Sequence, residues 1–215
     1  MTAPIVFGAP YSVYLRAVRL ALEEKGVPYR LEEVDIFADG GPPEDYLARH
    51  PFARIPAFEH DGFRLYETSA ISHYVDEAFP GPPLMPSDLR QWARAHQIIS
   101  MLDNYAYRTL VWDVFVERVE VPQGGGTPDE TKIAEALPRA RTCLAAVEAL
   151  MAESAYLAGP RLSLADLRAA PMIAKFQMAP EGARLLNEFP GLARWWDGMA
   201  KRPSLAATRS AMDDA

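Results

Sequence analysis

Cysteine, long apolar runs and clustered positive charge are all scarce in this sequence. Its 215 residues include a single cysteine, Cys143, which cannot form an internal disulfide framework and indicates a reducing compartment. No cationic stretch precedes the first apolar residues after Met1, so we expect no signal peptide. No uncharged apolar run approaches the ~20 residues that a membrane helix needs. We therefore expect a cytoplasmic protein that does not associate with membranes.

Basic residues are outnumbered and dispersed. The chain has 22 Lys and Arg residues against 29 Asp and Glu residues, which gives a formal net charge of −7. Without a basic patch, neither nucleic acid nor an anionic membrane surface is an expected partner. The histidines lack metal-ligand spacing with cysteines or carboxylates, so we expect packing or surface roles for them and no metal site. They are His50, His60, His73 and His96.

A proline-rich stretch divides the chain. Residues 79–86 read Phe-Pro-Gly-Pro-Pro-Leu-Met-Pro, and such closely spaced prolines forbid a continuing helix and favour an extended connector. Short apolar runs mix with helical periodicity before this stretch, whereas the pattern after it is almost wholly helical. We therefore predict a first domain of residues 1–80 and an all-helical second domain of residues 87–215.

The first domain is predicted to contain a small sheet with helices packed on it. The helix after the first strand places Leu15, Val18 and Leu22 on one face and stops at Gly26. A turn around Gly62 joins two short strands into a hairpin. The predicted strands are 4–7, 29–36, 55–58 and 63–66, and the predicted helices are 12–25 and 68–78.

The second domain is predicted to begin with a long amphipathic helix over residues 87–118. Another helix is expected to start at Thr127, because Glu130 can complete a capping box with it. Ser163 and Asp166 form a second box of this design, in which the carboxyl group reaches back to the Ser163 amide. A last helix is predicted over residues 190–201.

Three segments of the first domain resemble the cytosolic glutathione transferases. They are Gly8-Ala-Pro-Tyr-Ser12 running into Arg16, His50-Pro-Phe-Ala-Arg-Ile-Pro-Ala57, and Leu65-Tyr-Glu-Thr-Ser-Ala-Ile71. Their order and spacing match the first domain of that family, and the helical remainder with Ala165-Asp166 matches its second domain. The resemblance implies an α/β plus all-α fold: a thioredoxin-like β-α-β-α-β-β-α domain followed by an all-helical domain.

The second and third segments carry the residues that the resemblance assigns to glutathione binding. A cis Ile55–Pro56 bond would turn the amide and carbonyl of Ile55 toward the cysteinyl part of the ligand, as an added strand does. The alternative is an ordinary trans proline that opens a strand. Glu67 and Thr68 would hold the γ-glutamyl end of the ligand at the positive end of a helix. Their alternative role is only to cap that helix.

Arg54 departs from the family pattern, in which glutamine is frequent before the Ile-Pro pair. Residues 37–43 lack the lysine or histidine that phi-type members use to hold the glycine carboxylate. Arg54 would supply the missing cation or else project into solvent. The departure indicates that glutathione binding is weak if no cation replaces the missing one.

Ser12 is the predicted thiol-activating residue. The Gly-x-Pro-x-Ser spacing with Arg16 resembles serine-using phi-type and related bacterial members of the family. A free thiol with a pKa near 8.5 is only ~3% thiolate at pH 7, and lowering that pKa by about two units needs ~2.7 kcal/mol. One hydrogen bond to the thiolate supplies ~1.5–3 kcal/mol, and a helix amino terminus adds up to about 1–2 kcal/mol. The alternative is that Ser12 only caps the helix, while Tyr11, Ala9 or a backbone amide holds the thiol.

A stripe on the long helix supplies candidates for an electrophile pocket, together with Tyr11 of the first domain. Tyr105, Arg108, Trp112 and Phe115 recur near i, i+3, i+7 and i+10, so they share one face of an α-helix. Such a stripe either packs in the core or, as the resemblance implies, forms one wall of the electrophile site. In the second case apolar or aromatic electrophiles fit best.

The resemblance implies a glutathione S-transferase, with glutathione as co-substrate, no metal, and a thiolate that attacks small hydrophobic electrophiles. Glutathione-dependent isomerase, dehalogenase or peroxidase activity is an alternative, and so is a non-catalytic interaction module that kept the fold. The resemblance also implies a homodimer in which Phe52 of one subunit enters the helices of the other. The alternative is that Phe52 folds back onto its own domain.

Overall fold

The computed structural model of the protein describes residues 2–210, which form two compact units. The first unit combines residues 2–84 with residues 203–210, and the second comprises residues 85–202. The predicted domain boundaries, 1–80 and 87–215, stay a prediction. The units meet between residues 84 and 85, close to the predicted boundary, and the main difference is that segment 203–210 packs with the first unit.

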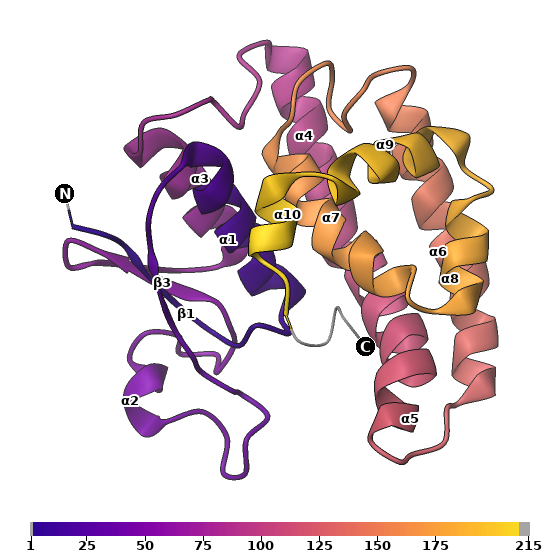
Figure 1. The fold of residues 1–215 in the computed structure, drawn as a ribbon, viewed down its shortest axis with the longest axis horizontal. Helices are drawn as coiled ribbons and strands as arrows, with labels where there is room; N and C mark the ends of the chain where they lie inside the picture. The colour runs from indigo at the N-terminus through magenta and orange to yellow at the C-terminus, as the bar shows by residue number, and fades with distance from the viewer. Residues whose placement is uncertain (1, 211–215) are drawn as a thin grey trace. The chain divides into compact units, whose positions relative to one another are not determined.

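The first unit contains a four-stranded sheet with helices packed on it (Figure 1). The strand order is β2-β1-β3-β4, with β1 parallel to β2 and antiparallel to β3, and with β3 antiparallel to β4. This mixed sheet confirms the predicted fold class. The elements are β1 (Ile5–Phe7), α1 (Val13–Lys25), β2 (Arg30–Glu32), α2 (Glu44–Leu47), β3 (Ala57–His60), β4 (Phe63–Tyr66), α3 (Thr68–Ala78) and α10 (Pro203–Ala207).

Helix α1 is buried along the face that its periodicity predicts. Leu15, Val18 and Leu22 expose 0% of their surface, and each such burial stabilises the fold by roughly 1.5–3 kcal/mol. Gly26 ends the helix in the left-handed conformation, with φ at 68°, which confirms the predicted stop. Helix α3 packs directly against α1.

The short helix α10 explains why the end of the chain belongs to the first unit. The carbonyl groups at the C-terminal end of a helix have no helical donors. Two side chains of α1 supply those donors: Arg16 donates to the carbonyl of Leu205 at 3.0 Å, and Arg19 donates to the carbonyl of Ala207 at 3.2 Å. Pro203 is the first residue of this helix.

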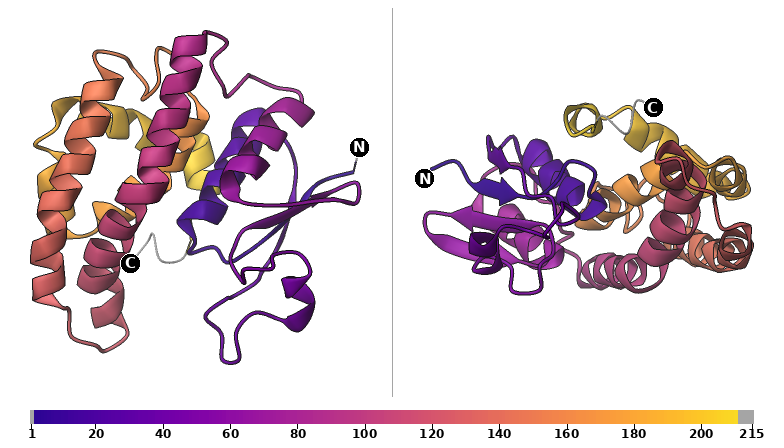
Figure 2. Two further views of the ribbon diagram at one scale, coloured as in Figure 1. Left: turned by 180° about the vertical axis from the view of Figure 1, so that it is seen from behind. Right: turned by 90° about the horizontal axis from the view of Figure 1, so that it is seen from below.

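The second unit consists of helices (Figures 1 and 2). The chain is helical without a break from Leu89 to Gln123, which confirms the long helix predicted over 87–118 and extends it. Its middle part, η1, has wider turns than an α-helix: the amide of Val121 donates to the carbonyl of Val116, five residues back. The elements are α4 (Leu89–Met101), η1 (Leu102–Glu120), α5 (Val121–Gln123), α6 (Glu130–Met151), α7 (Leu164–Phe176), α8 (Pro180–Leu186) and α9 (Pro190–Ala200).

One of the two predicted capping boxes is wrong and the other is confirmed. Helix α6 starts at Glu130 and is capped by Asp129, whose carboxylate accepts from the amide of Lys132 at 3.0 Å. Glu117 of η1 accepts from the amide of Asp129 at 3.2 Å and so holds this residue, rather than Thr127, at the cap. At the start of α7, the carboxylate of Asp166 accepts from the amide of Ser163 at 2.8 Å, as predicted.

Candidate functional site

The Ile55–Pro56 bond lies against the end of β1 in the first unit. The bond is cis, as the resemblance implies. Gly8 follows β1 with φ at 153°, and a Cβ atom added to it would lie 3.2 Å from Cβ of Ile55 and 3.3 Å from Cδ1 of Leu15. Ala9 and Ile55 belong to the same buried cluster. The glycine therefore allows the chain that leads to Ser12 to pass closely against the residue before the cis proline.

Ser12 caps helix α1. Its Oγ accepts a hydrogen bond from the amide of Leu15 at 3.2 Å, and its own amide donates to the carbonyl of Ala9 at 3.0 Å. This is the geometry of the alternative that leaves Ser12 as a cap. A serine hydroxyl that accepts one bond still has its own hydrogen to donate, so the cap is compatible with a bond to a thiolate.

Tyr11 faces the loop that follows β2. Its hydroxyl donates to Oδ1 of Asp35 at 2.7 Å, and its ring centroid lies 5.9 Å from that of Phe37. The same carboxylate oxygen accepts from the amide of Phe37 at 2.9 Å. These contacts link Tyr11 to the start of segment 37–43. That segment lacks the lysine or histidine that the resemblance would place there for the glycine carboxylate of glutathione.

Glu67 has an unusual backbone at the start of α3. Its φ and ψ are 71° and 114°, in a region that residues with a Cβ atom rarely adopt. Its side chain is exposed and makes no capping hydrogen bond with the helix. Thr68, the first residue of α3, is buried. The arrangement argues against the alternative in which the side chain of Glu67 only caps α3. Residue patterns alone did not predict the backbone conformation of Glu67.

His50 was expected only to pack or to lie on the surface. It is buried, and charged side chains of the proposed glutathione site act on it. The imidazole is 3% exposed, and its ring centroid lies 5.0 Å from that of Tyr66. Burial lowers the pKa of His50, the carboxylate of Glu67 raises it, and the guanidinium of Arg54 lowers it. His50 therefore lies within electrostatic reach of two predicted glutathione-binding residues. Its place at the start of segment 50–57, one of the three segments that resemble the family, could have suggested this position near the site.

Two exposed side chains complete the loop before the cis proline. Arg54 is exposed, and its carbonyl accepts from the hydroxyl of Tyr46 at 2.7 Å. Burial raises the pKa of that Tyr46 phenol. Phe52 is 65% exposed, although its ring lies 6.1 Å from that of Tyr66. Phe52 therefore touches its own unit while leaving most of its surface uncovered.

The predicted pocket stripe of η1 does not form one face. Tyr105 is exposed and Trp112 half-buried, whereas Phe115 is 1% exposed, with Nζ of Lys175 4.8 Å from its ring centre. The wider turns of η1 explain the difference, because the i, i+3, i+7 rule holds for α-helical turns. Phe115 therefore packs in the core of the second unit.

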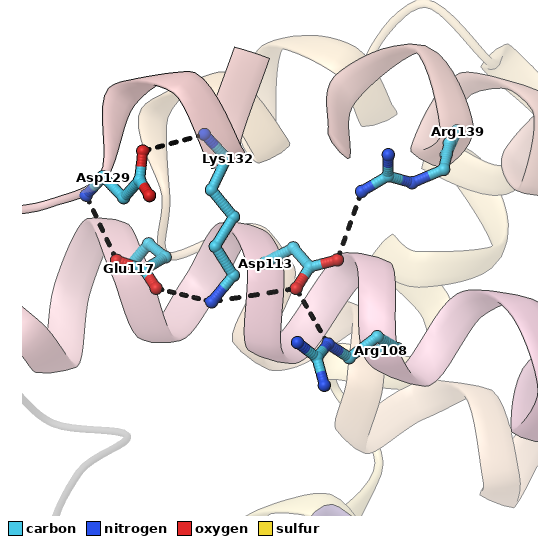
Figure 3. A network of polar contacts seen from close by, with 6 residues as sticks. All are labelled: Arg108, Asp113, Glu117, Asp129, Lys132 and Arg139. Carbon is cyan, nitrogen blue, oxygen red and sulfur yellow. Dashed lines mark hydrogen bonds and ion pairs between the residues drawn. The ribbon is translucent and has the colours of Figure 1, made fainter. Parts of the chain in front are cut away.

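Arg108, the remaining residue of the stripe, belongs to a polar network (Figure 3). Its Nε donates to Oδ1 of the buried Asp113 at 2.9 Å. Asp113 also pairs with Arg139 at 3.3 Å and with Lys132 at 3.9 Å. Lys132 bonds Glu117 at 2.6 Å, so the network joins η1 to α6.

Among residues 2–210, His, Cys, Asp and Glu side chains form no group that could hold a metal ion. No helix in the same part of the chain is both long and apolar enough to cross a membrane.

The chain resembles known proteins along its length. Residues 6–83 match the family described as glutathione S-transferase, N-terminal domain, and residues 130–197 match the corresponding C-terminal domain. Glutathione S-transferase F6 of Arabidopsis thaliana is 31% identical over 203 residues, which are 93% of this chain and 95% of that protein. The crystal structure of glutathione transferase F7 from Populus trichocarpa has a TM-score of 0.84 at 29% identity and covers 96% of this chain and 97% of its own. Glutathione S-transferase I from mais, in complex with an atrazine glutathione conjugate, has a TM-score of 0.85 at 28% identity and covers 99% of both chains.

Proposed function

Because this chain belongs to the glutathione S-transferase family, we propose that it activates the thiol of glutathione for attack on small hydrophobic electrophiles. One observation carries the proposal: Ile55, the residue before Pro56, lies against the chain between β1 and Ser12. A peptide ligand that pairs with the backbone of Ile55 would bring its cysteine toward the start of α1.

Each end of glutathione has a proposed partner in the first unit. Ile55 pairs with the cysteinyl backbone, and Pro56 fixes the direction of that backbone. Glu67 accepts from the α-ammonium of the γ-glutamyl group, while the start of α3 at Thr68 receives its α-carboxylate. Arg54 is exposed and supplies the cation for the glycine carboxylate.

Ser12 donates its hydroxyl hydrogen to the thiolate. The bond that Ser12 accepts from the amide of Leu15 supports this role, because an accepted bond polarises the hydroxyl and strengthens it as a donor. The helix amino terminus adds favourable potential for a negative sulfur. Together these effects reach the ~2.7 kcal/mol that a two-unit fall in thiol pKa requires.

The electrophile is proposed to bind beside Tyr11, Tyr105, Arg108 and Trp112, with Phe115 contributing as part of the supporting core. A relative that is described with an atrazine glutathione conjugate supports aromatic electrophiles as the substrate class. The protein is proposed to work in the cytoplasm as a homodimer in which Phe52 anchors the partner subunit. Residues 1–80 and 87–215 are its proposed glutathione-binding and electrophile-binding domains.

Retention on immobilised glutathione, followed by a rate assay with a chlorinated nitrobenzene, tests the function. We expect both retention and conjugate formation. Retention without turnover would favour the alternative of a non-catalytic module, for which the capping role of Ser12 is the supporting observation. Turnover of a peroxide or an isomerisable substrate in place of the nitrobenzene would favour the glutathione-dependent peroxidase or isomerase.

A further inference from the structure

Nδ1 of the buried His50 imidazole has no partner in another residue. It makes no hydrogen bond with any other residue in the range 2–210, although the side chain is 3% exposed. A buried polar atom left unbonded is unfavourable relative to a bonded one. An apolar ring would fill the same space without this cost, so packing alone does not account for a histidine here.

Aromatic contacts join His50 to the residue before Glu67. Its ring centroid lies 5.0 Å from that of Tyr66 and 6.3 Å from that of Phe52. Tyr66 is the last residue of β4, and Glu67 follows it directly with the left-handed backbone described above. The imidazole therefore supports the corner at which the proposed ammonium-binding carboxylate leaves the sheet.

Two charged side chains act on this imidazole. The carboxylate of Glu67 attracts a proton to it, and the guanidinium of Arg54 repels one. These side chains are the proposed partners of the two ends of glutathione. A positive charge on His50 would thus act on Glu67, which is also the proposed partner of the positively charged α-ammonium of glutathione.

We propose that His50 is a positioning residue of the glutathione site, which supports the Tyr66–Glu67 corner when neutral and opposes binding of the ligand α-ammonium when protonated. The proposal rests on the proposed function, because it assigns the ammonium to Glu67. An imidazolium and an ammonium that are both attracted by one carboxylate repel each other, and each weakens the attraction of the carboxylate for the other.

The sign of the effect follows from burial. Burial holds the pKa of His50 below its ordinary value of about 6.5, so the imidazole is neutral at pH 7. It therefore does not repel the ligand α-ammonium at this pH. As the pH falls through the lowered pKa, the imidazolium forms and the affinity for glutathione decreases. By linkage, bound ligand must lower the pKa of His50 in turn. We expect affinity to fall by about three- to tenfold once the imidazolium has formed, an estimate for a partly screened charge pair.

S-Methylglutathione is the probe of choice, because it keeps both ends of glutathione and has no thiol to titrate. Its affinity is measured by calorimetry between pH 5 and pH 8 for the wild type, His50→Asn, His50→Phe and the control His96→Gln from the second unit. His50→Phe keeps a ring against Tyr66, and His50→Asn keeps a polar atom near Nδ1. The wild type and His96→Gln should lose affinity in acid, whereas both His50 variants should lose clearly less.

Proton NMR of the four imidazoles gives a readout that a purely structural role would not change. Saturating S-methylglutathione should lower the pKa of His50, and Glu67→Gln should lower it without ligand. If the wild type and His50→Asn bind with the same pH profile, and ligand leaves the His50 titration unmoved, the role of His50 is overturned while the proposed function stands. If S-methylglutathione binds at no pH, the proposed function fails and this role fails with it. Should the His50 variants not fold, the wild-type titration decides.

Discussion

Two carboxylates stand at helix amino termini, one in each unit, and their surroundings are opposite. Asp166 is fully buried at the start of α7 and accepts four hydrogen bonds of 2.7–2.8 Å, from the amide of Leu157, the amide and hydroxyl of Ser163 and the indole of Trp195. Glu67 stands before α3, is exposed, and makes no capping bond.

The contrast separates a carboxylate used by the fold from one that the proposed function assigns to a ligand. Each donor to Asp166 is held in the second unit, so its removal would leave buried groups unbonded. Glu67 is exposed, and only its backbone carbonyl bonds to the helix, through the amide of Ile71 at 3.0 Å, while its side chain makes no capping bond. The two positions should therefore respond oppositely to mutation: stability should change at Asp166, and ligand affinity at Glu67.

Asp166→Ala should have the largest effect on stability. Four donors lose their acceptor, and we expect the free energy of unfolding to fall by at least about 3 kcal/mol. Urea unfolding followed by circular dichroism measures the change. Asp197→Ala, at an exposed position on α9, is the matched control and should stay within about 0.5 kcal/mol of the wild type. A loss below 1 kcal/mol at Asp166 would contradict the contrast.

Ser12→Ala should lower turnover by about 10–1000-fold, the range for loss of one donor to an anion. It should also cost about 0.5–2 kcal/mol of stability, because the cap of α1 is lost. Ser12→Asp separates the two effects, since a carboxylate can cap the helix but cannot donate to a thiolate. We expect Ser12→Asp to be as stable as the wild type and at least as slow as Ser12→Ala. Full activity in either variant would mean that another group activates the thiol.

Glu67→Ala should weaken glutathione binding by about 1.5–3 kcal/mol, the value of a charged hydrogen bond. Turnover at saturating glutathione and the free energy of unfolding should change little. Calorimetric titration with glutathione measures the affinity, and Glu77→Ala, an exposed position on the same helix, is the control. Unaltered affinity in Glu67→Ala would contradict the proposed orientation of the ligand.

Local patterns predicted the parts of the fold that depend on neighbours along the chain. The buried face of α1 follows from the spacing of Leu15, Val18 and Leu22, and the stop follows from Gly26. Glu67 lay in a recognisable segment, but its left-handed backbone did not follow from that segment. Residue spacing predicts which side chains meet within a helix, whereas it does not predict a single strained dihedral angle at the end of a strand.

Contacts between distant residues account for what could not be predicted. Glu117 holds the amide of Asp129 and so moves the start of α6 away from Thr127. The wide turns of η1 divide a stripe that is continuous only at 3.6 residues per turn. The unpartnered nitrogen of His50 depends on how a loop folds against β4, and one residue type at one position carries no signal of that.

Phe52→Ala tests whether an apolar side chain that its own unit leaves exposed contributes to the proposed dimer. The ring is 65% exposed, and a buried anchor of this kind is often worth about 2 kcal/mol or more at an interface. Twofold symmetry supplies the contact twice, so the dimer should weaken markedly. Sedimentation of the wild type and variant at low micromolar concentration measures this. A monomeric wild type removes the dimer proposal, and an equally tight variant dimer removes the role of Phe52.

The smallest expected effects concern Arg108 and Arg139, which share the buried carboxylate of Asp113. Their side chains are 72% and 53% exposed, so each ion pair should contribute no more than about 1 kcal/mol to stability. The proposed electrophile pocket includes Arg108 but not Arg139. Arg108→Ala and Arg139→Ala should therefore destabilise the protein to a similarly small extent, measured by urea unfolding. Only Arg108→Ala should raise KM for the nitrobenzene substrate, by up to about fivefold for the loss of one exposed contact. Equal KM values in the two variants would assign Arg108 to the Asp113 network alone.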